Sequence, residues 1–226
     1  MTCPLNIQDI GKIAYEPALK MQRELHASVL QQRHSENAQP FNLLLVEHDP
    51  PVLTLSKRPS ARDHLIATEK QLSDASVVVC QTDRGGDITY HGPGQLVGYP
   101  ICDLNELHLR LHGYMRFLED CIIEVLEQFG IQGERDHCAT GVWVDNAKIC
   151  AMGVRVSRWI SMHGFALNVN PNMDHFNLIV PCGLAGRQVT SMAELLGKKS
   201  PTMEEVKVVT STVFQNAVER QSNEQA

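Results

Sequence analysis

The hydrophobic periodicity of this 226-residue chain changes several times, and the order of the changes limits the folds open to it. Apolar residues recur about once per helical turn in three stretches, at 17–33, 111–129 and 203–219. Short apolar runs bounded by turn-forming residues are typical of buried strands, and they lie at 41–46, 52–55, 77–79, 141–144, 148–156 and 159–169. The order helix, strands, helix, strands, helix predicts an α+β fold, with a mixed α/β sheet and helices on a face.

No repeat, low-complexity block or Pro/Gly/Ser-rich linker divides the chain, so we expect one domain over residues 1–218. Residues 219–226 carry no large apolar side chain and are expected to form a flexible tail. Seven cysteines, odd in number and without a Cys-x-x-Cys pair, argue against a disulfide framework or a zinc ribbon. A reducing compartment fits this cysteine usage.

Charge and hydropathy exclude several classes of partner. The 20 Lys and Arg against 26 Asp and Glu give a formal charge of −6, which offers no overall attraction for nucleic acid. No apolar run approaches the ~20 residues that span a bilayer, and the first residues do not resemble a signal peptide. We therefore expect a cytoplasmic protein with neither a nucleic-acid nor a membrane partner.

Residues 84–101 hold five of the 15 glycines, together with Arg84, Thr89, Tyr90 and His91. Glycine permits positive φ and close backbone approach to a ligand. The spacing fits neither G-x-G-x-x-G nor a P-loop. Two interpretations remain open at this point: a ligand-binding loop, or a glycine-rich hairpin between strands at 86–90 and 95–101.

Two further residues are candidates for covalent chemistry. Cys182 lies in Pro181-Cys182-Gly183, directly after an apolar run, which would present a thiol on a loop at the end of a strand. Lys148 follows an Asp-Asn turn at the start of an apolar strand, where it could serve as a base or as a counter-ion to a thiolate. An ordinary loop cysteine and a solvent-facing lysine are the alternatives.

The histidines give a weaker signal. His108 and His112 have the four-residue spacing of helical metal ligands, but no H-E-x-x-H motif is present, so no metal is expected. His91 and His163 lie beside glycines in strand-like segments, where either a substrate contact or a role in the core is possible.

Taken in order, several segments resemble the lipoyl(octanoyl) transferases. They are RGGDITYHGPGQLVGYPI at 84–101, KICAMGVRV at 148–156, MHGFALNV at 162–169, and Pro181-Cys182-Gly183 followed by Thr190-Ser191-Met192. The resemblance spans residues 43–197 and includes an EHDPPVLTL segment at 47–55, in which Leu53 and Ser56 just after it depart from the usual aromatic residue and glycine.

The resemblance implies the biotin/lipoate protein ligase fold, a mixed sheet flanked by helices. It also implies transfer of an octanoyl group from octanoyl-acyl carrier protein to a specific lysine of lipoyl domains and of the glycine-cleavage H protein, without a cofactor. Cys182 would form the acyl thioester and Lys148 would assist it. We expect the chain to act as a monomer.

The resemblance further assigns an acyl-binding cavity. The matching residues are Arg84, Gly85, Gly86, Asp87, Ile88, Thr89, Tyr90, His91, Ala151, Met152, Gly153, Gly164, Phe165 and Ala166. Because acyl carrier protein is acidic, docking would need a local basic rim, for which the candidates are Lys57, Arg58, Arg62, Arg155, Arg158 and Arg187. The alternatives are an ATP-dependent lipoate or biotin ligase of the same fold and a non-catalytic scaffold that holds carrier domains.

Overall fold

The computed structural model describes residues 5–35, 38–180 and 186–223. Its larger sheet has the strand order β1-β2-β6-β10-β9-β8-β7. These strands are β1 (Asn6–Ile13), β2 (Phe41–His48), β6 (Gln95–Cys102), β7 (Glu134–Arg135), β8 (Val142–Val144), β9 (Ala147–Ser157) and β10 (Ile160–Asn168). The pair β1 and β2 is parallel, and the other neighbours are antiparallel. This is the mixed sheet that the sequence predicts.

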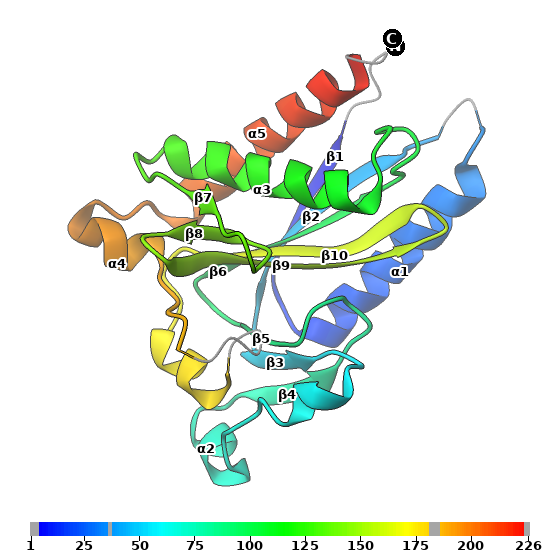
Figure 1. The fold of residues 1–226 in the computed structure, drawn as a ribbon. Coiled ribbons are helices and arrows are strands. Elements are labelled where there is room, and N and C mark those ends of the chain that lie inside the picture. The colour runs from blue at the N-terminus through cyan, green and yellow to red at the C-terminus, as the bar shows by residue number, and fades with distance from the viewer. Residues whose placement is uncertain (1–4, 36–37, 181–185, 224–226) are drawn as a thin grey trace.

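A smaller sheet has the order β4-β3-β5, with β3 (Val52–Leu55), β4 (Val78–Gln81) and β5 (Ile88–His91). It lies below the larger sheet in the view of Figure 1, where the start of α1 reaches it: Tyr15 and Leu19 of α1 pack with Val52 of β3. Its core joins Leu53 and Ile88 to Ile179. The expectation that residues 77–79 are buried is wrong for Val78 and Val79, which are 43% and 42% exposed because β4 is an edge strand.

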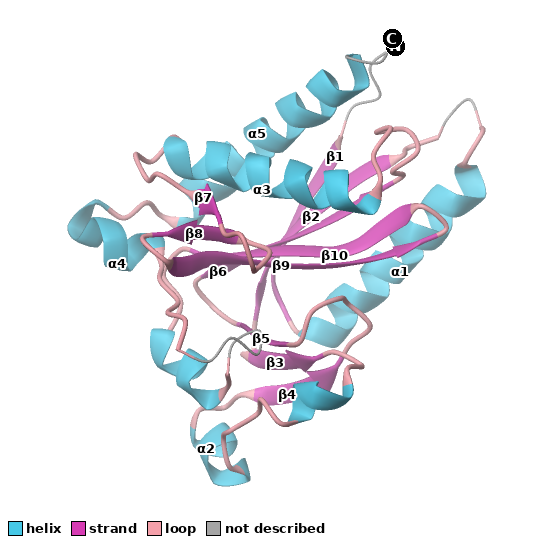
Figure 2. Ribbon diagram, viewed as in Figure 1, coloured by secondary structure: helices cyan, strands magenta, loops and turns pink. Residues whose placement is uncertain are grey.

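Three long helices cover the larger sheet on both faces (Figure 2). They are α1 (Tyr15–Gln32), α3 (Leu111–Glu127) and α5 (Met203–Asn223). Because side chains alternate along a strand, Leu43 and Leu45 of β2 join the core under α3 and α5, whereas Leu44 and Val46 join the core under α1. Burial of both faces explains the continuous apolar run of β2.

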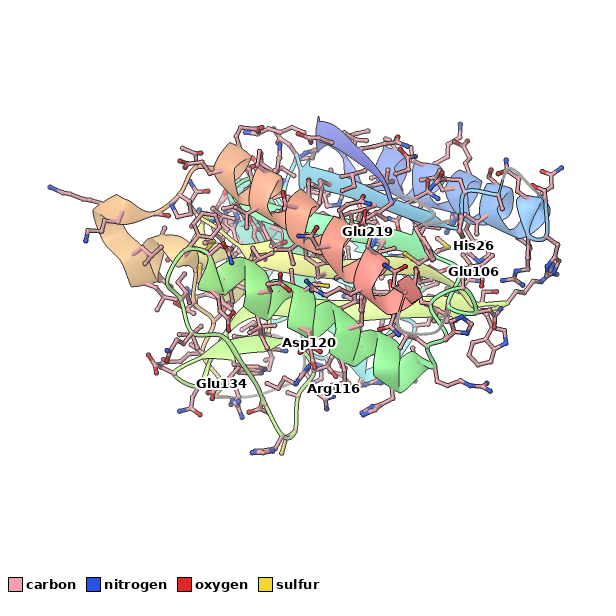
Figure 3. All side chains as sticks on the ribbon, turned by 90° about the horizontal axis from the view of Figure 1, so that it is seen from above. His26, Glu106, Arg116, Asp120, Glu134 and Glu219 are labelled. Carbon is pink, nitrogen blue, oxygen red and sulfur yellow. The ribbon has the colours of Figure 1, made fainter. Side chains whose placement is uncertain are left out.

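Shorter helices complete the fold: α2 (Glu69–Asp74), α4 (Met192–Leu196) and the 3-10 helices η1 (Pro59–Arg62), η2 (Met173–Leu178) and η4 (Gly197–Lys199). Helices α3 and α5 lie side by side when the molecule is seen from above, and Arg116 and Asp120 project from α3 toward the side where Glu134 lies (Figure 3). Arg116 and Arg135 both bond the buried carboxylate of Glu119. The Arg135 ion pair connects β7 to α3, whereas the Arg116 ion pair lies within α3.

The hairpin that the sequence left open as an alternative does not form, and part of the predicted tail is helical. Strands β5 and β6 do not form a hairpin, because β5 pairs with β3 in the small sheet and β6 pairs with β2 and β10 in the large one. Helix α5 also continues to Asn223, so residues 219–223 are helical where a flexible tail is expected. There Arg220 bonds Glu124 of α3 at 2.7 Å.

Candidate functional site

A cavity lies between the two sheets, with walls from β5 of the small sheet and from β6, β9 and β10 of the large one. The segment before β5 and the start of α1 close it. The residues that line it are Tyr15, Arg84, Gly86, Asp87, Ile88, Thr89, His91, Val97, Tyr99, Ala151, Met152, Gly153, His163, Gly164, Phe165 and Ala166. The wall is thus mainly apolar, with a few polar groups from the glycine-rich segment, as small-molecule sites commonly are.

The structure brings together most of the cavity residues that the sequence suggests. The expected residues found in the lining are Arg84, Gly86, Asp87, Ile88, Thr89, His91, Ala151, Met152, Gly153, Gly164, Phe165 and Ala166. Gly85 and Tyr90 are the two expected residues outside it. Segments 84–91, 151–153 and 164–166, far apart in the sequence, therefore meet at one place.

Gly85 does not line the cavity, but its backbone holds one wall of the cavity in place. Its backbone N–H donates to the carbonyl of Val154 at 2.9 Å, which holds the glycine-rich segment against β9. A Cβ at Gly153 would lie 2.7 Å from the Gly85 carbonyl oxygen. The two glycines therefore allow a close backbone approach that any side chain at position 153 would prevent.

Tyr90 belongs to the core of the small sheet. Its ring packs against His175 and Phe176, with ring centroids 5.2 and 5.0 Å away, and its hydroxyl lies 3.1 Å from His175 Nδ1. Burial raises the pKa of Tyr90 to about 12. Tyr90, which the resemblance assigns to the cavity, therefore packs among these residues and lies outside the cavity lining.

Arg84 is held by the small sheet. Its Nη2 donates to the carbonyl and the hydroxyl of Thr54 at 2.7 and 2.9 Å, and its Nη1 donates to the Gly85 carbonyl at 3.1 Å. Since Thr54 is fully buried in β3, this guanidinium fixes the start of the glycine-rich segment at the cavity.

Aromatic and histidine rings form one end of the wall. Tyr15 stacks parallel to His91 at 6.5 Å, and His48 meets both rings edge-on. His48 Nδ1 lies 3.0 Å from the Ile13 carbonyl and its Nε2 lies 2.6 Å from the Tyr99 hydroxyl. Burial lowers the pKa of His48 to about 4, so it is neutral, with Nδ1 donating and Nε2 accepting.

His163 shares the carboxylate of Asp83 with Arg155 at the same wall. His163 Nε2 lies 2.9 Å from Asp83 Oδ1, and Arg155 Nη1 donates to Asp83 Oδ2 at 2.9 Å. The hydrogen bond from His163 holds the pKa of Asp83 well below its usual range, although burial opposes it and Arg155 assists. Arg155 is therefore paired within the chain, as is Arg187 with Asp136. Of the proposed basic rim, Lys57, Arg58 and Arg62 are exposed on the segment after β3.

Lys148 lies near the start of β9, three residues before Ala151, and is 7% exposed. Its N–H donates to the Gln188 carbonyl at 2.9 Å, and its carbonyl accepts from the Thr190 N–H at 3.0 Å. Its ammonium lies 4.8 Å from the centre of the Trp143 ring. The alternative of a solvent-facing lysine is therefore wrong. Lys148 is not in the cavity lining, and Cys182 lies outside the described residues.

Sequence reasoning missed Tyr15, Val97 and Tyr99, and left His163 open. Val97 and Tyr99 lie within the glycine-rich segment at the two-residue spacing of one strand face, so alternation along 95–101 could have found them. Tyr15 begins α1, and no local pattern connects it with a cavity built from residues 84–166.

Among the described residues, no group of three or more His, Cys, Asp and Glu side chains is arranged to hold a metal ion. Within the same part of the chain, every helix is too short or too polar to cross a membrane.

Residues 14–215 match the family model "Lipoyl protein ligase A/B catalytic domain". An octanoyltransferase from Gloeobacter violaceus is 47% identical, covering 90% of this chain and 86% of that protein. One from Flavobacterium psychrophilum is 43% identical, covering 92% and 93%. One from Porphyromonas gingivalis is 46% identical over 85% of this chain but only 40% of its own length.

Solved structures share the fold at low sequence identity. A putative lipoate protein ligase from T. acidophilum with bound lipoic acid superposes with a TM-score of 0.70 at 12% identity, covering 98% of this chain and 94% of that one. A biotin protein ligase from Aquifex aeolicus gives 0.59 at 14% identity, covering 96% and 72%. This likeness agrees with the expected biotin/lipoate ligase fold.

Proposed function

Because this chain belongs to the lipoyl protein ligase A/B catalytic domain family, we propose that it is an octanoyltransferase of protein lipoylation. Its donor is octanoyl-acyl carrier protein, and its acceptors are lysines of lipoyl domains and of the glycine-cleavage H protein. The observation that carries the proposal is sequence identity of 43% and more to octanoyltransferases across most of the chain. The apolar cavity three residues along β9 from Lys148 supports it.

The reaction that we propose has two steps. The thiolate of Cys182 attacks the donor thioester, and a new carbon–sulfur bond forms to Cys182. The donor carbon–sulfur bond breaks, and the sulfur of the carrier leaves with the electron pair and takes a proton from the Lys148 ammonium. The acceptor amine then attacks the octanoyl-Cys182 thioester, the amide bond forms, and the sulfur of Cys182 leaves with the electron pair. The first step exchanges one thioester for another and the second is downhill, so no ATP is required.

The residues of the cavity would act by binding. Ile88, Met152 and Phe165 give apolar contacts, and the glycines at 153 and 164 leave space beside them. Burying each CH₂ of an alkyl chain contributes about 0.8 kcal/mol. Lys148 would stabilise the Cys182 thiolate and then assist removal of a proton from the incoming amine.

The test is the intact mass of the protein after mixing with octanoyl-acyl carrier protein in the absence of an acceptor. We expect the mass of one octanoyl group to be added, to be lost on treatment with hydroxylamine, and to be absent in Cys182→Ala. The matched control is Cys138→Ala, because Cys138 is exposed and free and should leave acylation unchanged.

Two outcomes would contradict this proposal. Acylation of a lipoyl domain only when ATP is added, and unaffected by Cys182→Ala, would identify an ATP-dependent ligase. Absence of both thioester and product with folded protein would favour a scaffold that only binds carrier domains.

Lys148 is tested separately by the rate of thioester formation. Lys148→Met keeps an unbranched side chain over Trp143 but removes the charge, and we expect the rate to fall by about 10²- to 10⁴-fold. Lys207→Met is the control, because Lys207 is also 7% exposed but lies on α5, bonded to Asp9 and Glu204. Equal rates for the two variants would remove Lys148 from the mechanism.

A further inference from the structure

A buried chain of amide side chains connects His91 in the cavity to the backbone beside Lys148. His91 Nδ1 lies 2.9 Å from Gln95 Oε1, Gln95 Nε2 donates to Asn168 Oδ1 at 2.9 Å, and Asn168 Nδ2 donates to the Thr190 carbonyl at 2.9 Å. Gln95 is 1% exposed and Asn168 is 3% exposed. Neither residue belongs to the cavity wall.

The backbone end sets the direction of every hydrogen bond in this chain. The Thr190 carbonyl can only accept, so the Asn168 amide must turn its NH₂ group toward it and its oxygen toward Gln95. Gln95 must then donate to Asn168 and accept from His91. Nδ1 of His91 therefore carries the proton, and Nε2 is left with a lone pair on a ring that lines the cavity.

The protonation state of His91 agrees with this assignment. Burial holds the pKa of His91 well below its usual value, and nearby His48 and Arg84 act in the same direction. The imidazole is thus neutral, and its Nε2 is a hydrogen-bond acceptor and not a donor.

The far end of the chain reaches Lys148. The Thr190 N–H donates to the Lys148 carbonyl at 3.0 Å, and the Lys148 N–H donates to the Gln188 carbonyl at 2.9 Å. Val189 forms a parallel bridge with Lys148. Because Asn168 binds Thr190 from β10, it holds this strip of residues 188–190 against the backbone that carries the Lys148 side chain.

We propose that Gln95 and Asn168 are positioning residues of the transfer reaction, which fix His91 as a hydrogen-bond acceptor at the cavity and hold Lys148 in place through Thr190. The group that His91 would receive is an N–H of the acyl donor or of the incoming amine. The part that concerns Lys148 rests on the proposed function.

The first experiment measures the His91 tautomer in the wild-type protein and does not depend on activity. In a sample with ¹⁵N-labelled histidine, the signals of His91 are assigned by their loss in His91→Gln. We expect a protonated Nδ1 and an unprotonated Nε2 at neutral pH. A proton on Nε2 would overturn the hydrogen-bond directions and the proposal with them.

The second experiment compares kcat for Asn168→Asp and Asn42→Asp. Asn42 is a matched control: it is also 3% exposed, donates to the Gln39 carbonyl at 3.2 Å and accepts from Asn6 Nδ2 at 3.0 Å. Each substitution replaces an amide that donates to a backbone carbonyl by a carboxylate. The two positions differ in their partners: the Asn168 side chain bonds Gln95 and Thr190, whereas the Asn42 side chain bonds Asn6 and Gln39.

We expect Asn168→Asp to lower kcat about tenfold more than Asn42→Asp, which is the effect of one misplaced buried polar group. KM for the donor should change by less than about twofold, since a positioning residue does not contact the acyl chain. Equal kcat values for the two variants would overturn the proposal.

If Asn168→Asp does not fold, Gln95→Glu makes the same comparison, because its carboxylate cannot donate to Asn168. A loss of kcat larger than that of Asn42→Asp supports the positioning role of the amide chain, and an unchanged kcat overturns it. Failure of the wild-type protein to transfer octanoyl groups would instead refute the proposed function, and the tautomer measurement would still decide the assignment of His91.

Discussion

Gly164 lies where β10 passes against β6, and a Cβ built there would sit 2.3 Å from the carbonyl oxygen of Gly98. A backbone oxygen in a paired strand cannot move aside as the end of a side chain can. We therefore expect Gly164→Ala to lower the free energy of unfolding by about 1–3 kcal/mol, the usual cost of overpacking a core. Urea unfolding measures this.

The control for Gly164 is the same substitution in a helix. Gly113 lies in α3, and a Cβ there would meet only the end of the Leu109 side chain, at 3.4 Å. Gly113→Ala should raise the free energy of unfolding by about 0.5–1 kcal/mol, because alanine loses less backbone freedom on folding. A change of stability in the same direction for both substitutions would show that the close approach to Gly98 does not set the cost at position 164.

Among single residues, the family resemblance names most of those that line the candidate cavity, but it does not give the outline of the cavity. A contiguous run such as 84–91 was assigned to the cavity as a whole, yet Tyr90 turns to the other side of β5 and packs on Phe176. Tyr15 enters from a helix some 70 residues away from that run, and no local pattern indicates it. Direction within a strand and contacts between distant segments depend on tertiary packing.

Among the elements, α5 supports the cavity from behind. Phe214 of α5 is 1% exposed and stacks on Phe165 of β10 with ring centroids 5.3 Å apart, and Phe165 lines the cavity. We expect Phe214→Ala to lower the free energy of unfolding by about 3–5 kcal/mol, since the ring fills a core that closes only partly around a smaller residue.

Val208→Ala is the control on the same helix, because Val208 is 66% exposed. It should change stability by less than about 0.5 kcal/mol. Thermal or urea unfolding of both variants gives the comparison. A loss for Phe214→Ala no larger than that for Val208→Ala would mean that α5 does not support the Phe165 wall.

Hydrophobic periodicity is sufficient to predict some of the helices and strands but not others. The three long helices and the strands from 141 onward are found close to their predicted positions, and the Asp145-Asn146 turn has positive φ at both residues, as a tight hairpin requires. Strand β1 was missed because Asn6–Ile13 is partly exposed and alternates poorly. The pairing of β5 was missed because adjacent strands in the sequence usually pair, and here they belong to different sheets.

On the scale of the whole molecule, three histidines from three strands are buried between the sheets and α1. They are His48 of β2, His91 of β5 and His163 of β10, each at most 6% exposed. Burial lowers the pKa of all three, to about 4 for His48. The folded protein therefore keeps them neutral at pH values where the unfolded chain binds protons on them.

This difference gives the fold a predicted dependence on pH. Below the unfolded pKa of 6.5, the unfolded state binds more protons than the folded state, so stability falls as pH falls. Each of the three histidines can contribute a slope of up to about 1.4 kcal/mol per pH unit, down to its own folded pKa. Asp83 adds a loss in the same direction only below its unfolded value of 3.8.

Urea unfolding between pH 7 and pH 5 measures this slope. His48→Gln should reduce the slope by the contribution of one titrating group, up to about 1.4 kcal/mol per pH unit. Glutamine can still donate to the Ile13 carbonyl but does not titrate. His112→Gln, at an exposed position on α3, should leave the slope as it is in the wild type. A free energy of unfolding that stays constant or rises as the pH falls from 6.5 to 5 would contradict the burial of neutral histidines between the sheets.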